Sequence, residues 1–230
     1  MPTLLPRIEI ESASNPRAAV IWLHGLGADG SDFTPLVDEL DLNGCPPIRF
    51  IFPHAPAIPV TLNGGYVMPA WYDIRGTALV RDEDRDGIEA SASAIEALIT
   101  NEVQRGIGPG AIVLAGFSQG CAMALHTGLR HPAPLAAIIA LSGYLPLAHT
   151  LAAQRSAANQ TTPIFMAHGS DDSVVPLARA LASKQALSEL GYRVQWHSYD
   201  MGHSVHPQEV TDIAQFLRAV LGCGPGASRS

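Results

Sequence analysis

The stretch "VLAGFSQGCAMALHTG", Val113 to Gly128, changes character at one serine. The residues before Ser118 are mostly apolar, as in a buried parallel strand, and those after it are mostly small and helix-forming. A chain that passes from strand to helix at one residue needs a strained, positive-φ turn, and the residues two before and two after it approach closely. Glycine at positions 116 and 120 removes the side chains that would clash there. The stretch therefore predicts a strand–turn–helix unit that lifts the serine hydroxyl out of a sheet.

Strand-like and helix-like segments alternate along the rest of the chain. The strand-like runs are "LLPRIEI", "AAVIWLHG", "IRFIFPHA", "AIVLAGFS", "AAIIALSG", "PIFMAHGS" and "VQWHSYDM". Most are nearly continuous apolar runs, which is typical of buried parallel strands, whereas the first alternates like an edge strand with one wet face. Strand–helix alternation predicts an α/β fold with a mostly parallel central sheet, flanked by helices on both faces.

Three longer segments have the pattern of helices. In residues 86–106 a capping box is expected at Asp86 and Glu89. The apolar face expected there consists of Ile88, Ala92, Ile95, Leu98, Ile99 and Val103. Two further helices are expected to open at Pro176 and Pro207 and to end at Gly191 and Gly222.

Two segments do not fit this alternation. Residues 53–76 contain four prolines, which exclude a long helix or a central strand, so this segment is either a lid or pocket wall or an irregular surface excursion. The tail 222–230, "GCGPGASRS", is expected to be disordered. Without a repeat or a linker-like composition shift, residues 1–221 are expected to form a single domain.

Composition narrows the class of protein. The chain has 230 residues, of which 47% are hydrophobic and 15% charged, and its net charge of −7 argues against a nucleic-acid partner. No apolar run approaches the roughly 20 residues of a membrane span, and the start lacks the long apolar region of a signal peptide. The three cysteines, Cys45, Cys121 and Cys223, are expected to be free thiols in a reducing compartment, with a disulfide between two of them as the alternative.

A serine hydroxyl needs a base, and the base needs an orienting carboxylate. After a nucleophile on this kind of turn the partners follow in the order acid, then histidine. "PIFMAHGSDDSVVP" offers Asp171 and Asp172, between which spacing alone does not decide. "VQWHSYDMGHSVHP" offers three histidines, of which His203 is the best base because it lies on a loop after the strand.

These residues allow other interpretations. His197 falls within the strand and His206 at a helix start, and a metal bound by His203 and His206 would lack a third ligand. Ser118 could instead be a plain capping serine at a strand-to-helix turn. We expect catalytic chemistry because the strand before Ser118 and the helix after it supply the context that the motif requires.

Acyl transfer also needs donors for an oxyanion. One is expected to be the backbone N–H of Gln119, directly after the serine. The other is expected at Leu26, in the loop "HGLGADG" that follows an early strand. This loop also reads G-x-G-x-x-G, but it lacks the lysine of a phosphate-binding P-loop and the later acidic residue of a dinucleotide fold.

Taken together, these motifs resemble the phospholipase/carboxylesterase family of α/β-hydrolases, which includes acyl-protein thioesterases and small bacterial carboxylesterases. The resemblance runs from "VIWLHGLGADGSDF" through "FPHAPAIPVTLNGGYVMPAWYDI", "GFSQGCAMAL" and "HGSDDSVVP" to "DMGHSVHPQE". It implies an α/β-hydrolase fold, Ser118 as nucleophile, His203 as general base and Asp172 as the acid. Leu26 and Gln119 carry over as the oxyanion donors.

The resemblance also implies residues of a substrate pocket and a substrate class. Trp71, in "MPAWYDI", is expected to help wall the acyl site, and Val174 beside the acid is expected to contact an acyl chain. No cofactor and no metal are expected, and the expected substrate is a small ester or acyl compound. The expected location is cytoplasmic. Family members often form homodimers. Two departures from the family pattern are Cys121, where a glycine is common, and Ser173, where proline or aspartate is common.

The function expected from these residues is cleavage of carboxylic esters, or of acyl thioesters, through an acyl-enzyme. Lysophospholipase or peptidase activity on the same fold is the first alternative, because a fold does not fix the substrate. A non-catalytic binding protein on a dead hydrolase scaffold is the second.

Overall fold

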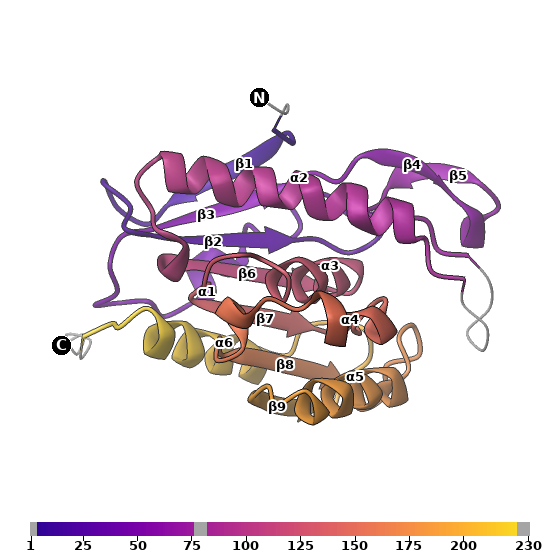
Figure 1. Ribbon diagram of the computed structural model, residues 1–230. Coiled ribbons are helices and arrows are strands. Elements are labelled where there is room, and N and C mark those ends of the chain that lie inside the picture. The colour runs from indigo at the N-terminus through magenta and orange to yellow at the C-terminus, as the bar shows by residue number, and fades with distance from the viewer. Residues whose placement is uncertain (1–3, 76–81, 225–230) are drawn as a thin grey trace.

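The computed structural model describes residues 4–75 and 82–224. Its centre is a seven-stranded sheet in the order β1-β3-β2-β6-β7-β8-β9 (Figure 1). The strands are β1 (Arg7–Glu11), β2 (Ala18–Leu23), β3 (Ile48–Pro53), β6 (Ile112–Phe117), β7 (Ala137–Leu141), β8 (Ile164–Gly169) and β9 (Val194–Tyr199). Only β1 runs antiparallel to its neighbour, and it lies at an edge, as its alternating sequence predicted. The expected mostly parallel α/β sheet is therefore confirmed.

Helices cover both faces of this sheet because the strands are apolar on both faces. Along β2, Ala19, Ile21 and Leu23 pack into one buried cluster, and the intervening residues pack into another on the opposite face. The first cluster includes residues of α2 (Arg85–Gln104), α3 (Gln119–Gly128), α4 (Ala148–Gln154) and α5 (Leu177–Glu189). The second includes residues of α1 (Leu36–Glu39) and α6 (Pro207–Val220). This arrangement confirms the expected layers of an α/β-hydrolase fold.

The turn at Ser118 has the conformation that its sequence predicts. β6 ends at Phe117, Ser118 adopts φ 55° and ψ −115°, and α3 begins at the next residue. A Cβ added at Gly116 would overlap the carbonyl oxygen of Gly120, so the two glycines are in contact across the turn. Such a φ is costly for a residue other than glycine and is kept only where the surroundings enforce it.

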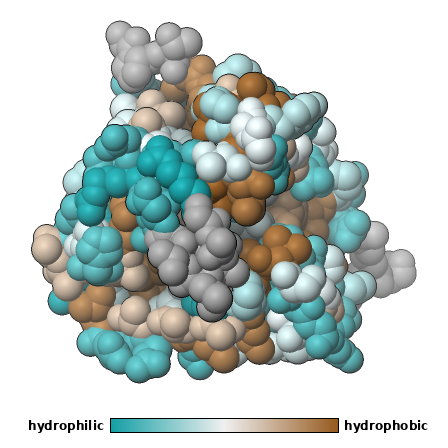
Figure 2. Space-filling model, turned by 90° about the vertical axis from the view of Figure 1, so that its right-hand side faces the viewer, coloured by the Kyte–Doolittle hydropathy of each residue, from teal (hydrophilic) through white to brown (hydrophobic). Residues whose placement is uncertain are grey.

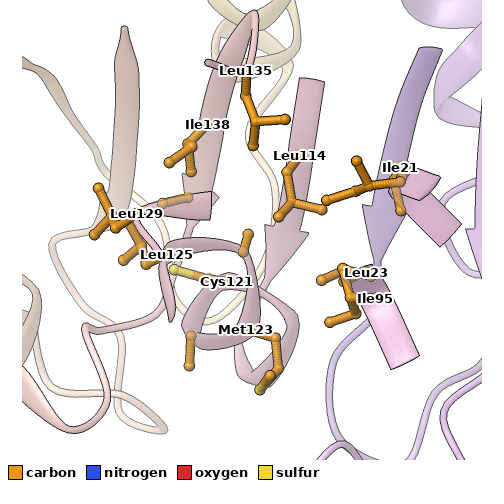
Figure 3. Close-up of a cluster of buried hydrophobic side chains, with 14 of the residues drawn as sticks. Ile21, Leu23, Ile95, Leu114, Cys121, Met123, Leu125, Leu129, Leu135 and Ile138 are labelled. Carbon is orange, nitrogen blue, oxygen red and sulfur yellow. The ribbon is translucent and has the colours of Figure 1, made fainter. Parts of the chain in front are cut away.

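Cys121 lies directly behind this turn in the core. It is completely buried on α3 among the apolar side chains seen in Figure 3. A Cβ added at Gly143 would come within 2.5 Å of the Cys121 sulfur, so the glycine after β7 leaves room for this side chain. Burial raises the pKa of the Cys121 thiol, which keeps it a neutral packing group.

Replacing Gly120 with alanine is expected to destabilise the fold by about 3 kcal/mol. The new methyl group would overlap the carbonyl oxygen of Leu23 and would lie 2.7 Å from the carbonyl oxygen of His24. Helix α3 would have to move away from β2, and neither backbone segment can yield cheaply. Urea unfolding followed by circular dichroism measures the change. Gly108→Ala is the matched control, because Gly108 has φ −62° and nothing within 4 Å of an added Cβ. Equal stability of the two variants would contradict this account of the turn.

The proline-rich segment is more ordered than its sequence suggested. It contains an antiparallel hairpin of β4 (Ala57–Val60) and β5 (Tyr66–Pro69), joined by a turn that includes a 3-10 helix (Thr61–Asn63). Pro59 and Pro69 are tolerated because this two-stranded sheet is separate from the main one. Gly76, the last residue of the segment, lies outside the described residues.

Helix α2 differs from prediction at both ends. Its N-cap is Asp84, whose carboxylate accepts a hydrogen bond from the Gly87 amide, so the expected capping box at Asp86 is wrong. Asp86 lies inside the first turn of the helix instead. Val103 is 41% exposed and does not belong to the buried face, whereas its neighbour Glu102 is buried and pairs with Arg49 of β3. The other two helices start at or directly after their prolines, as predicted.

The expectation of three free thiols is wrong, because Cys45 and Cys223 form a disulfide. Only Cys121 is free. The two bonded residues are 178 positions apart in sequence, and the fold brings the end of the chain after α6 back to the loop before β3. Residues 222–224, assigned above to a disordered tail, are thus tied to the body of the protein, while 225–230 lie outside the described residues. The pairing also removes the reason given above for a reducing compartment.

Across the described residues, no helix combines the length and apolar character needed to cross a membrane.

Candidate active site

The site lies at the carboxyl ends of the parallel strands, which is where α/β sheets place ligands. The arrowheads of these strands point to the right in Figure 1, and Figure 2 shows that side of the molecule, on which apolar patches alternate with polar ones. Ser118 follows β6, Asp172 follows β8 and His203 follows β9. Three strands distant in sequence thus deliver the three side chains to one edge.

These three side chains form a continuous hydrogen-bonded chain. His203 Nε2 lies 2.8 Å from Ser118 Oγ, and His203 Nδ1 lies 2.7 Å from Asp172 Oδ2. Because a carboxylate can only accept, Nδ1 carries the hydrogen, and Nε2 is left free to accept the serine proton. The ring of Phe117 packs 4.8 Å from the His203 ring and helps fix its plane. The arrangement can move a proton from the serine hydroxyl to the imidazole.

Asp172 and Asp171 differ in burial and in hydrogen-bond partners. The Asp172 side chain is fully buried, and its Oδ1 accepts hydrogen bonds from the backbone amides of Val174 and Val175, at 2.9 and 2.8 Å. These bonds hold the carboxylate with its other oxygen toward His203. Asp171 is exposed, and its backbone instead bonds Met201.

The other two histidines of this region do not take part in the hydrogen-bonded chain from Ser118. His197 lies in β9, stacked on Phe165, and His206 caps α6, as predicted. Within the described ranges, no group of three or more histidine, cysteine, aspartate and glutamate side chains could hold a metal ion.

The two expected oxyanion donors lie beside Ser118. Leu26 and Gln119 line the same cavity as Ser118, and a Cβ added at Gly25 would lie 3.4 Å from the Ser118 Cβ. Gln119 is the first residue of α3, so its N–H has no intrahelical acceptor. Within residues 4–75 and 82–224, neither the Leu26 nor the Gln119 amide donates to a protein acceptor. Both amides are therefore available to an oxygen atom above Ser118.

The cavity has a volume of about 260 Å³ and mostly apolar walls. Val174 lines it and is 59% exposed, and its contact with an acyl chain stays a prediction. The sequence did not mark several other lining residues, among them Leu62, Ile74 and Tyr144. Leu62 and Ile74 belong to the proline-rich segment, so that segment supplies part of the pocket wall. No local motif marks Tyr144, which reaches the cavity because it follows β7 at the same edge.

Trp71 does not have the expected position in the cavity wall. It is only 1% exposed and is absent from the lining residues. Its indole lies behind the Leu26 loop, where Nε1 donates to the His24 carbonyl oxygen at 2.9 Å. Its neighbour Tyr72 is likewise buried, and the hydroxyl of Tyr72 lies 2.9 Å from that of Tyr144.

A buried carboxyl lies on α6, directly after the His203 loop. Glu209 Oε2 accepts from the His206 amide at 3.1 Å, which completes a capping box, while Oε1 has no partner among the described residues. Burial raises the pKa of Glu209 to about 7, the charge of Asp212 adds to the rise, and the His206 hydrogen bond opposes it. The side chain therefore gains a proton near neutral pH in the folded protein.

Glu209 is expected to make stability fall as the pH rises. The folded state keeps a proton on Glu209 up to pH about 7, whereas the unfolded chain releases it near the ordinary pKa of a glutamate, 4.5. The stabilisation is complete below pH 4.5 and is lost as the pH rises through about 7. Glu209→Gln keeps an acceptor for the cap but does not titrate. The melting temperature of the variant minus that of wild type should therefore increase from pH 5 to pH 8. The exposed Glu189→Gln, on α5, is the control; an equal gain there would rule out Glu209 as the source.

Comparisons with known proteins point to one family. The family model described as phospholipase/carboxylesterase matches residues 6–221. Acyl-protein thioesterase 1 of Gibberella zeae is 41% identical over 219 residues, covering 91% of this chain and 93% of that protein. Acyl-protein thioesterase 1 of Yarrowia lipolytica is 39% identical over 220 residues, covering 92% and 96%. The crystal structure of Zea mays acyl-protein thioesterase 2 superposes with a TM-score of 0.84 at 30% identity, covering 95% of this chain and all of that one. The chain is thus a hydrolase and belongs to the phospholipase/carboxylesterase family.

Proposed function

We propose that this protein cleaves carboxylic esters and acyl thioesters through a covalent acyl-enzyme on Ser118. The observation that carries the proposal is the hydrogen-bonded chain from Ser118 through His203 to Asp172, with both distances below 3 Å. A nucleophile, a base and an orienting carboxylate in this geometry are the requirements of acyl transfer. The acyl-protein thioesterases to which the chain is similar support the thioester part of the proposal.

In the first half of the reaction, Ser118 Oγ attacks the acyl carbon while His203 Nε2 takes the serine proton. Asp172 holds the imidazole in the correct tautomer and stabilises the cation that forms. The negative charge on the carbonyl oxygen is held by the amides of Leu26 and Gln119, each contributing about 3 kcal/mol to the transition state by analogy with measured removals of such donors. The leaving thiol or alcohol takes the proton from His203, and the acyl group remains esterified to Ser118.

In the second half, water replaces the leaving group. His203 removes a proton from the water as its oxygen attacks the acyl carbon, and then returns that proton to Ser118 Oγ as the acyl–serine bond breaks. The carboxylic acid departs, and the resting enzyme is restored. Each step uses groups of this chain and water alone.

The cavity supports an apolar acyl group. Leu62 and Ile74 of the proline-rich segment and Val174 of the loop after β8 line it, and their apolar side chains offer contact surface to a hydrocarbon chain. Burial of each methylene contributes about 0.8 kcal/mol to binding.

Labelling with a fluorophosphonate probe tests the proposal. The probe phosphonylates an activated serine, so we expect one adduct per chain, located by mass spectrometry on the peptide that contains Ser118. Prior incubation with an acyl thioester should slow the labelling by occupying the site. A chain that stays unlabelled, or one labelled at another serine, would exclude the acyl-enzyme mechanism and favour a non-catalytic role. A panel of matched esters, thioesters and lysolipids would then rank the substrate classes.

A further inference from the structure

The two oxyanion donors come from segments far apart in the sequence. Leu26 follows β2 and Gln119 follows β6, yet both amides must point at one oxygen atom with an accuracy of about 0.5 Å. Each segment therefore needs a support that fixes it relative to the other. The buried hydrogen bonds around Trp71 supply such a support.

The first support acts on the peptide bond between Gly25 and Leu26. His24 Nε2 accepts a hydrogen bond from the Ala55 amide at 3.0 Å, so the ring hydrogen is on Nδ1, which donates to the Gly25 carbonyl oxygen at 2.7 Å. Burial lowers the pKa of His24, which keeps this neutral tautomer. In a trans peptide the C=O and the following N–H point in opposite directions. Fixing the Gly25 carbonyl therefore fixes the direction of the Leu26 N–H.

The second support links this loop to α3. Trp71 Nε1 donates to the His24 carbonyl oxygen at 2.9 Å, and the Trp71 backbone amide donates to Gln119 Oε1 at 2.8 Å. Gln119 Nε2 in turn donates to the Tyr72 carbonyl oxygen at 2.7 Å. The Trp71 carbonyl oxygen accepts a hydrogen bond from Ser91 Oγ of α2. One residue thus connects the Leu26 loop, the start of α3 and the long helix α2.

All of these groups are removed from water. Trp71 and His24 are 1% exposed and Gln119 is 3% exposed. A buried hydrogen bond that loses one partner leaves a group that water cannot solvate, so the loop would move to satisfy it. A shift of 1 Å at a catalytic group can lower a rate about a hundredfold.

We propose that Trp71 is a positioning residue that holds the Leu26 and Gln119 amides at a fixed separation around the oxyanion. This role rests on the proposed acyl-enzyme function and replaces the expectation that Trp71 helps wall the acyl site. Trp71 acts on the transition state through the two donors and leaves the binding of the substrate's hydrocarbon part unchanged.

Trp71→Phe tests the role because it removes the indole N–H and keeps an aromatic ring. We expect kcat for a p-nitrophenyl ester to fall about ten- to a hundredfold, with KM within about twofold of wild type. Affinity for a trifluoromethyl ketone, whose adduct with the serine carries an oxyanion, should fall by the same factor as kcat/KM. Affinity for an ether analogue without a carbonyl oxygen should not change.

Trp22→Phe is the matched control. Trp22 lies in β2, is also 1% exposed, and its Nε1 has no hydrogen-bond partner among the described residues. Its replacement therefore changes a buried tryptophan without breaking a bond, and we expect kcat to stay within about twofold of wild type.

Gln119→Met carries the test if Trp71→Phe does not fold, because it breaks the link to α3 from the other side. It should lower kcat with little change in KM, and the double variant should lose less than the product of the two single losses. A fall in kcat no larger than that of Trp22→Phe, or a loss confined to KM, would overturn the positioning role. Neither result would affect fluorophosphonate labelling of Ser118 in the wild type, so the two proposals fail separately.

Discussion

Ser118→Ala is expected to lower kcat/KM for a p-nitrophenyl ester by about a millionfold, as removal of the nucleophile does in a well-studied serine protease. The alanine lacks the oxygen that forms the acyl-enzyme, and no other hydroxyl is hydrogen-bonded to His203 among the described residues. The residual activity should come from the oxyanion donors and binding alone. Initial rates at substrate concentrations well below KM measure the change directly.

The fold of this variant should remain intact. Alanine keeps the Cβ of serine, so the backbone strain of the positive φ is the same in both proteins. Ser204→Ala is the control, because Ser204 is adjacent to His203 and exposed, and it should retain nearly full activity. A Ser118→Ala protein that unfolds at the wild-type temperature and still turns over substrate at more than about a hundredth of the wild-type rate would exclude the covalent mechanism.

The sequence predicted the buried strands and the turn at Ser118. In both, the residue types themselves restrict the backbone conformation. The continuous apolar runs are typical of strands covered on both faces, and the glycines around Ser118 favour a close approach of the two backbone segments. His203 was distinguished from its neighbours because it alone follows a strand and precedes a helix cap. A prediction is reliable where the local sequence and the tertiary packing favour the same backbone conformation.

The parts that escaped prediction depend on distances through space. Cys45 and Cys223 are 178 residues apart, and only the completed fold brings them together. The hairpin in the proline-rich segment forms because its two strands pair with each other outside the main sheet, which composition does not reveal. Trp71 was expected to wall the pocket, yet its partners His24 and Gln119 lie 47 and 48 positions away. Ser118, Asp172 and His203 were easier to predict than Trp71. Sequence motifs mark the first three, whereas the role of Trp71 is defined only by its contacts in the folded protein.

Asp171 and Asp172 show the same limit within one dipeptide. Both follow β8, and spacing alone did not distinguish them. The buried position of Asp172, with two backbone amides on one oxygen and His203 on the other, distinguishes them in space.

Asp172→Asn is expected to lower kcat by about ten-thousandfold while leaving the fold intact. The asparagine carbonyl can still accept from the Val174 and Val175 amides, so its NH₂ group would face His203 Nδ1. An amide donor there requires Nδ1 to accept, which moves the ring hydrogen to Nε2. With that hydrogen in place, Nε2 cannot take the proton of Ser118, and the nucleophile stays a neutral hydroxyl.

Asp171→Asn is the matched control for this change. It removes the same unit of charge one residue away, on an exposed side chain, so kcat should stay within about twofold of wild type. The rate of fluorophosphonate labelling should separate the two variants in the same order, since the probe also requires an activated serine. If both variants lost activity equally, the negative charge of the loop would be the cause, and the tautomer of His203 would not be. If only Asp172→Asn is inactive, the orientation of one imidazole hydrogen decides whether Ser118 reacts.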